Sequence, residues 1–351
     1  MEFGMFHEFQ RRPGQTEAAA FTESFEQVDA AERWGLDAMW LAELHVAPDR
    51  SVLAAPLTIA AAIAARTARM KIGIAVQVLP LCQPLRLAEE AATVDHLSHG
   101  RLIFGVGRSG FPRTYDAYGI PYAESRERFA EVLEILRRAW TEDRFSFAGQ
   151  FYRYDNVCLV PKPYSRPMPE IRIAATSPDT YAAIGAQGYP IFCAVRLGTL
   201  SELGPNLAAY REAWQAAGHP GRGQVFLRVP VYVADTEAAA RTEPEDSIMH
   251  FYRVLGAQLE QTATAAGARA VEQRAERGAR LQSIDYDEVL REKIVVGTPR
   301  MVTDRLAALR EELGIDGILA ELNCGARIPH ARVMRSLELL CGEVMGDFRP
   351  D

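Results

Sequence analysis

Short apolar runs alternate along the chain with longer stretches in which apolar residues recur at helical spacing. The run at residues 71–79 is apolar and β-branched almost throughout, which is typical of a strand buried on both faces of a parallel sheet. The clearest helical pattern lies at residues 122–140, where apolar positions share one face. Eight runs of the first kind predict strands, at residues 2–6, 38–41, 71–79, 102–106, 171–175, 190–195, 224–233 and 317–322.

The stretches between these strands predict helices. They lie at residues 16–34, 56–65, 84–97, 122–140, 200–217, 299–313 and 330–344. Strands that alternate with helices run parallel with right-handed crossovers, and eight such units close most simply into an α/β fold, the (β/α)8 TIM barrel. An open, doubly wound sheet is the alternative.

Two stretches of the chain lie outside the eight predicted strand–helix units of the barrel. Residues 145–160 are aromatic and partly alternating, which predicts an inserted hairpin. Residues 236–295, after the seventh strand, are rich in Ala, Glu, Gln and Arg and predict a helical insertion. The sequence shows no internal repeat, low-complexity tract or linker, so we expect residues 1–351 to form a single domain.

Composition and charge argue against several classes of protein. The 351 residues carry 39 Lys and Arg against 46 Asp and Glu, a net charge of −7, whereas a nucleic-acid duplex binder needs a basic face. The 5 cysteines are odd in number and widely spaced, which disfavours a disulfide framework or a zinc ribbon and is consistent with a reducing cytosol. We find no signal peptide, no metal-ligand spacing and no apolar stretch of the roughly 20 residues that a bilayer requires. We therefore expect a cytoplasmic protein that binds neither nucleic acid, membrane nor metal.

The loops after the fourth and fifth strands carry groups suited to an anion. In barrels of this kind the loops after the strands hold the active site. Gly107 and Gly110 let a ligand approach the backbone, and Arg108 offers a fork of donors suited to phosphate. Thr176 and Ser177 add hydroxyls just before a helix start, where unpaired N–H groups favour a phosphate. The ordinary alternatives are a common glycine-rich loop and a helix cap.

Two histidines at strand ends are candidate acid–base groups. His7 follows the first strand, and His45 follows the second, two residues after Glu43. Histidine titrates near neutral pH and can donate or accept a proton. The alternative is that each histidine only forms hydrogen bonds in the pocket wall.

Five segments of the chain resemble the bacterial luciferase-like, flavin-dependent monooxygenases. They are FGMF at residues 3–6, WGLDAMWLAELH at 34–45, IGIAVQVLPLCQPLRLAEEAATVDHLSHGRLIFGVGRS at 72–109, IRIAATSPDTYAAIGAQGYPI at 171–191 and VGTPRMVTDRLAALREELGIDGILAELNCGARIP at 296–329. Together they cover nearly the whole chain in the family's order. The resemblance implies a barrel with an insertion, usually dimeric, that uses reduced FMN (FMNH2) and O2.

The resemblance assigns a flavin site residue by residue. Arg108 and Ser177 match the positions that hold the FMN phosphate, and Thr176 and Thr180 lie in the same phosphate loop. The other cofactor-binding positions that it implies are Ala75, Val76, Gly107 and Ala175. Many members of the family have a non-proline cis peptide beneath the flavin ring at the position of Ala75–Val76.

The catalytic positions match with one departure. Glu43 matches the acid of the family's strand-two motif, and His45 matches the second of its two adjacent histidines. The luciferases have Glu-His-His with the first histidine catalytic, whereas this chain has Leu44 at that position. Light-producing aldehyde chemistry is therefore not expected. Gly107 stands where luciferase has a reactive cysteine, as glycine does in other members.

A sparse site suits this chemistry, because the protein needs only to orient the flavin, exclude water and supply one acid or base. From strand position alone we expect the substrate pocket to be lined by Phe6, His7, Phe111, Tyr115 and Phe192.

The resemblance thus implies an FMN-dependent monooxygenase that oxygenates a small organic substrate by hydroxylation or Baeyer–Villiger insertion. A separate flavin reductase would supply the reduced FMN, and the enzyme would be a homodimer. One alternative is a deazaflavin-dependent dehydrogenase of the same superfamily. Another is a non-catalytic flavin-binding subunit, and its best support is that Leu44 replaces the catalytic histidine of the luciferases. The sequence does not identify the substrate.

Overall fold

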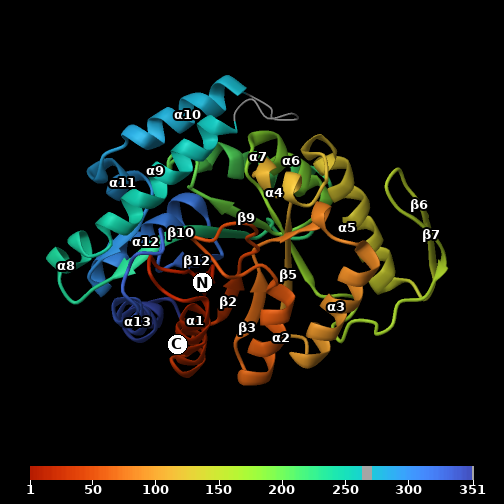
Figure 1. The fold of residues 1–351 in the computed structure, drawn as a ribbon, viewed down its shortest axis with the longest axis horizontal. Coiled ribbons are helices and arrows are strands. Elements are labelled where there is room, and N and C mark those ends of the chain that lie inside the picture. The colour runs from red at the N-terminus through yellow and green to blue at the C-terminus, as the bar shows by residue number, and fades with distance from the viewer. Residues whose placement is uncertain (263–270, 350–351) are drawn as a thin grey trace.

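Eight parallel strands close into a barrel in the computed structural model, which describes residues 1–262 and 271–349 (Figure 1). In order around the barrel they are β1 (Glu2–His7), β2 (Ala38–Leu41), β3 (Lys71–Ile74), β5 (Leu102–Gly107), β8 (Glu170–Ala174), β9 (Ile191–Ala194), β10 (Val225–Val233) and β12 (Gly317–Glu321). The last strand, β12, pairs with β1 and closes the ring. The predicted TIM barrel is confirmed, and the open sheet is excluded.

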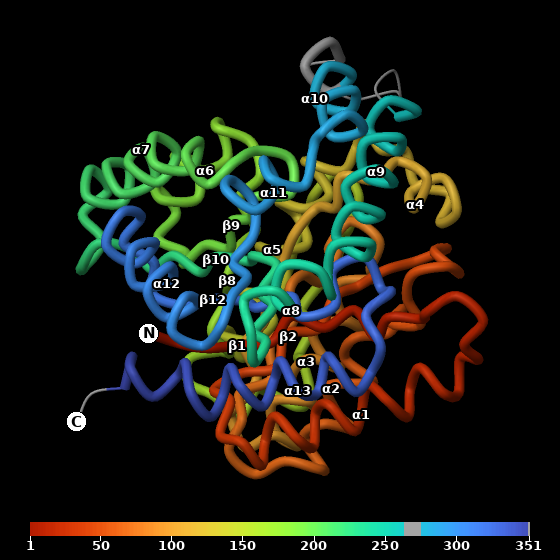
Figure 2. Tube along the Cα trace, turned by 90° about the vertical axis from the view of Figure 1, so that its left-hand side faces the viewer, coloured from red at the N-terminus to blue at the C-terminus, as the bar shows by residue number. Residues whose placement is uncertain are grey.

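Helices cover the outside of the barrel (Figures 1 and 2). They are α1 (Glu17–Arg33), α2 (Pro56–Arg66), α3 (Pro84–Leu97), α5 (Ser125–Thr141), α6 (Pro178–Gln187), α7 (Leu203–Ala216), α12 (Pro299–Leu313) and α13 (His330–Leu339). Local capping interactions set the ends of these helices. The hydroxyl of Thr16 accepts a hydrogen bond from the backbone N–H of Ala19 at 3.2 Å and caps α1. Gly314, with a φ of 61°, ends α12.

The run at residues 71–79 does not form the single strand that its pattern predicts. It divides into β3 and the short β4 (Gln77–Val78), which pairs with β5, and the cis peptide Ala75–Val76 separates the two. Two further short elements escaped prediction, α4 (Pro112–Ala117) and β11 (Val295–Gly297). Elements this short do not complete the repeats that reveal a periodicity.

Both predicted insertions are present. The hairpin consists of the antiparallel β6 (Phe145–Ala148) and β7 (Arg153–Val157). After β10 the chain forms α8 (Glu237–Thr242), α9 (Glu245–Gln261), α10 (Val271–Ser283) and α11 (Tyr286–Glu292). Residues 263–270 of the predicted insertion lie outside the described part of the chain. Along that part no helix is both long and apolar enough to cross a bilayer.

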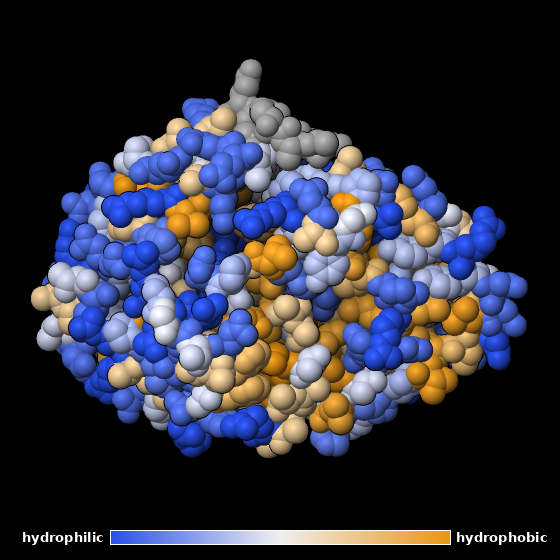
Figure 3. All heavy atoms as spheres, in the orientation of Figure 1, coloured by the Kyte–Doolittle hydropathy of each residue, from blue (hydrophilic) through white to orange (hydrophobic). Residues whose placement is uncertain are grey.

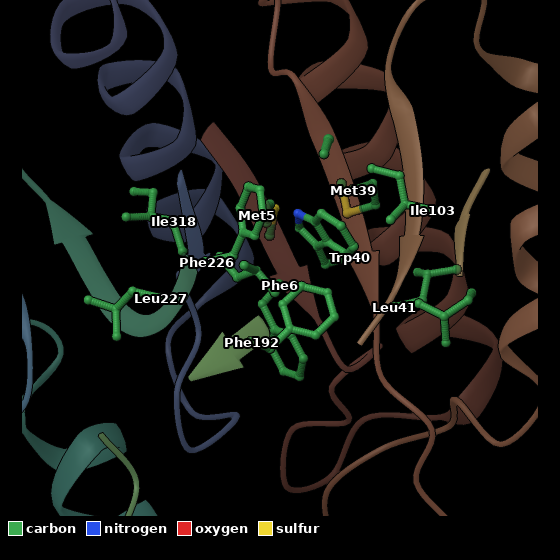
Figure 4. Packing of buried hydrophobic residues seen from close by; sticks show 14 of the residues in the cluster. Met5, Phe6, Met39, Trp40, Leu41, Ile103, Phe192, Phe226, Leu227 and Ile318 are labelled. Carbon is green, nitrogen blue, oxygen red and sulfur yellow. The ribbon is translucent and has the colours of Figure 1, made fainter. Parts of the chain in front are cut away.

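Three glycines make room for large rings inside the barrel. A Cβ added to Gly73 would lie 1.9 Å from Cε3 of Trp40, and one added to Gly4 would lie 2.2 Å from Nε1 of the same ring. At Gly105 an added Cβ would lie 2.6 Å from Cε2 of Phe192. Figure 4 shows the rings that fill this space, which are Phe6, Trp40, Phe192 and Phe226.

Gly73→Ala is expected to destabilise the protein, because the new methyl group would force the Trp40 ring from its place. Overpacking a core costs about 1–3 kcal/mol, which lowers the unfolding midpoint of a protein of this size by about 2 °C or more. The matched control is Gly204→Ala in α7, where nothing lies within 4 Å of the added Cβ. Thermal unfolding followed by circular dichroism measures both variants, and equal midpoints would contradict the packing.

Candidate active site

Glu43 is the centre of a hydrogen-bonded group at the C-terminal ends of β2 and β4. Its Oε1 lies 2.7 Å from Nε2 of His45. Its Oε2 accepts hydrogen bonds from the side-chain amide of Gln77 at 2.7 Å and from the backbone N–H of Val78 at 2.6 Å. The hydroxyl of Tyr118, just after α4, lies 2.9 Å from Nδ1 of His45. The structure therefore brings the two predicted catalytic residues together.

These partners fix the position of the proton on His45. A carboxylate only accepts hydrogen bonds, so Nε2 of His45 carries a proton and donates it to Glu43. Nδ1 is then the acceptor for the hydroxyl of Tyr118. Burial and the charge of Glu43 raise the pKa of Tyr118, which keeps that hydroxyl protonated. The result is a directed chain of donors from Tyr118 through His45 to Glu43.

A cavity of about 250 Å³ adjoins this group, and Glu43, His45 and Tyr118 line it together with residues of α2 and α3. Cys82 is also in its wall, where burial and the charge of Glu43 raise the pKa of the thiol and disfavour the nucleophilic thiolate. Leu44 packs against the main hydrophobic core. Among the described residues no group of three His, Cys, Asp or Glu side chains is placed to hold a metal ion.

The predicted phosphate-binding residues follow two adjacent strands, β5 and β8. Arg108 follows β5, and its Nη1 donates a hydrogen bond to Oγ of Ser125 at 2.8 Å. Thr176 and Ser177 precede α6, and their backbone N–H groups both donate to Oγ1 of Thr180 at 3.3 Å. Ser177 is the N-cap residue of α6 and Thr180 completes the capping box, so the alternative role as a helix cap applies to Ser177. A guanidinium, two hydroxyls and a helix N-terminus fit the donor set that a phosphate dianion requires.

The remaining predicted cofactor residues lie beside these loops. The peptide between Ala75 and Val76 is cis, as the resemblance implies. A Cβ added to Gly107 would lie 2.4 Å from Cγ2 of Val76, so this close approach leaves no room for a cysteine at that position. Ala175 is buried directly after β8.

His7 does not line the predicted pocket. Side chains alternate along β1, and His7 lies on the outer face of the barrel, where its Nε2 is 3.0 Å from Oε1 of Gln27 on α1. Its Nδ1 accepts a hydrogen bond from the backbone N–H of Phe9 at 2.9 Å. Burial lowers the pKa of His7 to about 4. A neutral histidine with both nitrogens bonded packs α1 against the barrel and has no free site for a substrate proton.

Two of the predicted pocket aromatics belong to the barrel interior. Phe192 packs edge-on against Trp40, with 5.1 Å between ring centres. Phe6 lies beneath the guanidinium of Arg228, whose Cζ is 3.5 Å from the ring centre. Phe6 and Phe192 therefore support the barrel mouth from below.

The other two aromatics lie on the loop after β5. Tyr115 is buried, and its hydroxyl donates a hydrogen bond to the backbone carbonyl of Arg108. It therefore holds the phosphate loop in place and does not line a pocket. Phe111 lies at the mouth, with the Cζ of Arg196 5.8 Å from its ring centre.

Sequence reasoning missed a buried cluster of charges at the C-terminal end of the barrel. Glu8, after β1, accepts hydrogen bonds from Nε of Arg50 at 2.7 Å and from Nη2 of Arg228 at 3.2 Å. Nη2 of Arg228, in β10, also donates to Oε2 of Glu321 at 2.7 Å. Burial alone would raise the pKa of Glu8, but Arg50 and Arg228 lower it to about 2. Charged residues inside apolar strands, such as Arg228 and Glu321, are the signal that could have revealed this cluster.

Comparisons with known proteins agree with the resemblance. A family model described as luciferase-like monooxygenase matches residues 1–317. The oxygenase component of the flavin-dependent trigonelline monooxygenase of Acinetobacter baylyi is 26% identical over 99% of this chain and 96% of its own length. The crystal structure of monooxygenase RslO1 from Streptomyces bottropensis matches with a TM-score of 0.83 and 26% identity, over 99% of this chain and 100% of that chain. The F420-dependent glucose-6-phosphate dehydrogenase of Kineococcus radiotolerans is 30% identical over 60% of this chain and 63% of its own length.

His7 predicts a specific dependence of stability on pH. Because its pKa falls from 6.5 in the unfolded chain to about 4 in the fold, the unfolded state binds more protons in this window. The contribution of His7 to the free energy of unfolding is then fully present above pH 6.5. It declines as the pH falls towards 4, by about 2 kcal/mol between pH 7 and pH 5. His7→Gln should be less stable at pH 7 but should lose this slope, whereas His96→Gln, at an exposed position, should keep it. Urea unfolding at several pH values measures both, and parallel slopes for the wild type and His7→Gln would refute the assignment.

Proposed function

Because the chain belongs to the luciferase-like monooxygenase family, we propose that it is a flavin-dependent monooxygenase that uses reduced FMN and O2 to oxygenate a small organic substrate. The reaction is a hydroxylation or a Baeyer–Villiger insertion. One observation carries the proposal: the phosphate-suited donors after β5 and β8 lie at the same end of the barrel as the Glu43–His45 group. A phosphate-bearing cofactor and a proton-handling group thus share one mouth.

The donor set of the phosphate loops fits FMN. Arg108, Thr176 and Ser177 hold the phosphate in this proposal, and Thr180 keeps the N-terminus of α6 in shape for it. Ala75, Val76, Gly107 and Ala175 border the flavin. Bound reduced FMN supplies the electrons that activate O2, so the protein itself needs to bind, orient and exclude water.

Glu43 and His45 are the catalytic residues of this proposal. Nδ1 of His45 is the nitrogen that can take a proton from a group in the cavity, and the carboxylate of Glu43 stabilises the positive charge that results. Tyr118 covers Nδ1 and keeps it aligned until a substrate group replaces the hydroxyl. Leu44 leaves the site with this one histidine.

The second candidate is a deazaflavin-dependent dehydrogenase, which the match to an F420-dependent enzyme favours. That enzyme class transfers hydride without O2. Titration of the wild-type protein with FMN and with F420 separates the two, as does O2 uptake when the protein receives reduced FMN. Tighter binding of F420 and no O2 uptake with any substrate would favour the dehydrogenase.

We also propose two protein partners. A separate flavin reductase supplies the reduced FMN, and a second copy of the chain completes a homodimer. Figure 3 shows apolar residues gathered around α2 and α3. Near the end of α3, Leu97 is 52% exposed and Tyr164 is 50% exposed, and the Tyr164 ring is 5.7 Å from that of His96. Exposed apolar groups of this kind favour association with another protein.

Arg108→Ala is expected to raise the Kd for FMN about tenfold, because it removes a charged donor from the phosphate. Riboflavin has the same ring system without the phosphate, so its Kd should stay unchanged. Arg113→Ala, at an exposed position of α4, is the matched control for the loss of one charge. Fluorescence titration measures all three proteins, and unchanged FMN affinity in Arg108→Ala would sink the phosphate assignment.

The tautomer of His45 tests the proton chain. In the wild-type protein ¹⁵N NMR of labelled histidine should find the proton on Nε2, because the carboxylate of Glu43 can only accept. Glu43→Gln supplies an amide donor and should allow the tautomer to reverse. Tyr118→Phe, which leaves the carboxylate intact, should retain the wild-type tautomer. A proton on Nδ1 in the wild type would contradict the chain.

A further inference from the structure

Arg196, two residues after β9, is a partly buried cation, and two of its three guanidinium nitrogens have no hydrogen-bond partner among the described residues. Its Nε and Nη2 are shielded from solvent, and no hydrogen bond or ion pair reaches them from the described residues. Charged N–H donors that are shielded from water and lack an acceptor cost free energy, which a protein retains only where something else offsets it. We propose that Arg196 binds the carboxylate of an anionic organic substrate. This inference names the substrate class of the proposed monooxygenase and rests on that function.

The charge balance of the barrel mouth favours an anion there. The carboxylates that act most strongly on Arg196, beside Arg50 and Arg228, are those of two described residues, Glu8 and Glu321. Arg50 and Arg228 already occupy those carboxylates through hydrogen bonds. Burial and the charges of Arg228 and Arg50 lower the pKa of Arg196, so the two carboxylates do not compensate it. One further negative charge would balance the cluster.

The geometry of the unpaired atoms matches a carboxylate. Nε and Nη2 form the edge of a guanidinium that binds both oxygens of a carboxylate side by side. The same two nitrogens of Arg50 form this fork with the two oxygens of Glu8. In Arg196 the equivalent edge is unused. At the barrel mouth the fork of Arg50 is therefore filled by a carboxylate of the protein, whereas that of Arg196 is available to a carboxylate of a ligand.

Aromatic rings define the shape of the site around Arg196. The ring centres of Phe111 and Phe251 lie 5.8 Å and 5.3 Å from its Cζ. The hydroxyl of Tyr252, on α9 beside Phe251, is a further buried polar atom without a partner among the described residues. The charge of Arg196 acts on Tyr252, which places both in one buried region. A small acid with an aromatic or other apolar body suits these walls.

Matched acids and amides test the proposal. Calorimetric titration with benzoate, benzamide, acetate and acetamide compares each anion with a neutral molecule of the same shape. An acid should bind the wild type more tightly than its amide, and Arg196→Gln should weaken the acid about tenfold or more while leaving the amide unchanged. Arg113→Gln is the control for charge. Amides that bind as well as their acids, or equal affinity in Arg196→Gln, would overturn the proposal.

The stability of the free protein gives an independent readout. Arg196→Met replaces a partly buried cation that has two unpaired nitrogens with an apolar side chain of similar length, so its unfolding midpoint without ligand should rise by about 2 °C or more. A lower midpoint would show that Arg196 serves the fold and would overturn the assignment.

Flavin titrations keep this inference distinct from the proposed function. If Arg196→Gln weakened FMN but not riboflavin, Arg196 would belong to the FMN phosphate and the carboxylate assignment would fail. If the wild type bound no FMN but still preferred acids through Arg196, the proposed function would fail and the anion site would stand.

Discussion

The interior of a closed parallel barrel holds only a few large side chains, and this limit orders the rest of the structure. Three aromatic rings fill the middle of the barrel, those of Trp40, Phe192 and Phe226. The strands leave room for such rings by having glycine at Gly4, Gly73 and Gly105. No space is left there for charged groups. The inward-facing charges of the strands therefore collect at the two ends of the barrel.

The charges at the two ends of the barrel are paired to different extents. At the N-terminal end the guanidinium of Arg172 lies 3.4 Å from the ring centre of Phe226 and pairs with Glu2 and Glu170. At the C-terminal end Arg228 lies over Phe6 in the same manner, but the cluster around it contains one cation more than its carboxylates can pair. At both ends of the core a guanidinium is stacked on an aromatic ring. Only the C-terminal end carries a positive charge that no carboxylate of the cluster pairs. That end is the one on which loops after the strands build active sites.

The alternation of apolar runs and helical stretches was sufficient to predict the barrel, because each strand is buried on both faces and each helix on one. It also placed Glu43 and His45 after β2, and Arg108 and Ser177 on the loops after the adjacent strands β5 and β8. It failed for His7, since the parity of side chains along β1, rather than position at the strand end, decides which face a residue occupies. The charge cluster escaped because Glu8, Arg50 and Arg228 lie far apart in sequence and meet only when the barrel closes.

In the proposed enzyme, the residues around the substrate and those around the cofactor phosphate come from different parts of the chain. Phe251 and Tyr252 come from α9, whereas Arg108, Thr176 and Ser177 come from loops after β5 and β8. The insertion has its own small hydrophobic core, formed by residues such as Ile248, Leu255 and Val289. Because this core is separate from that of the barrel, substitutions within it leave the proposed phosphate loops in place. In the proposed enzyme, such a layout confines a change of substrate preference to one segment of the chain.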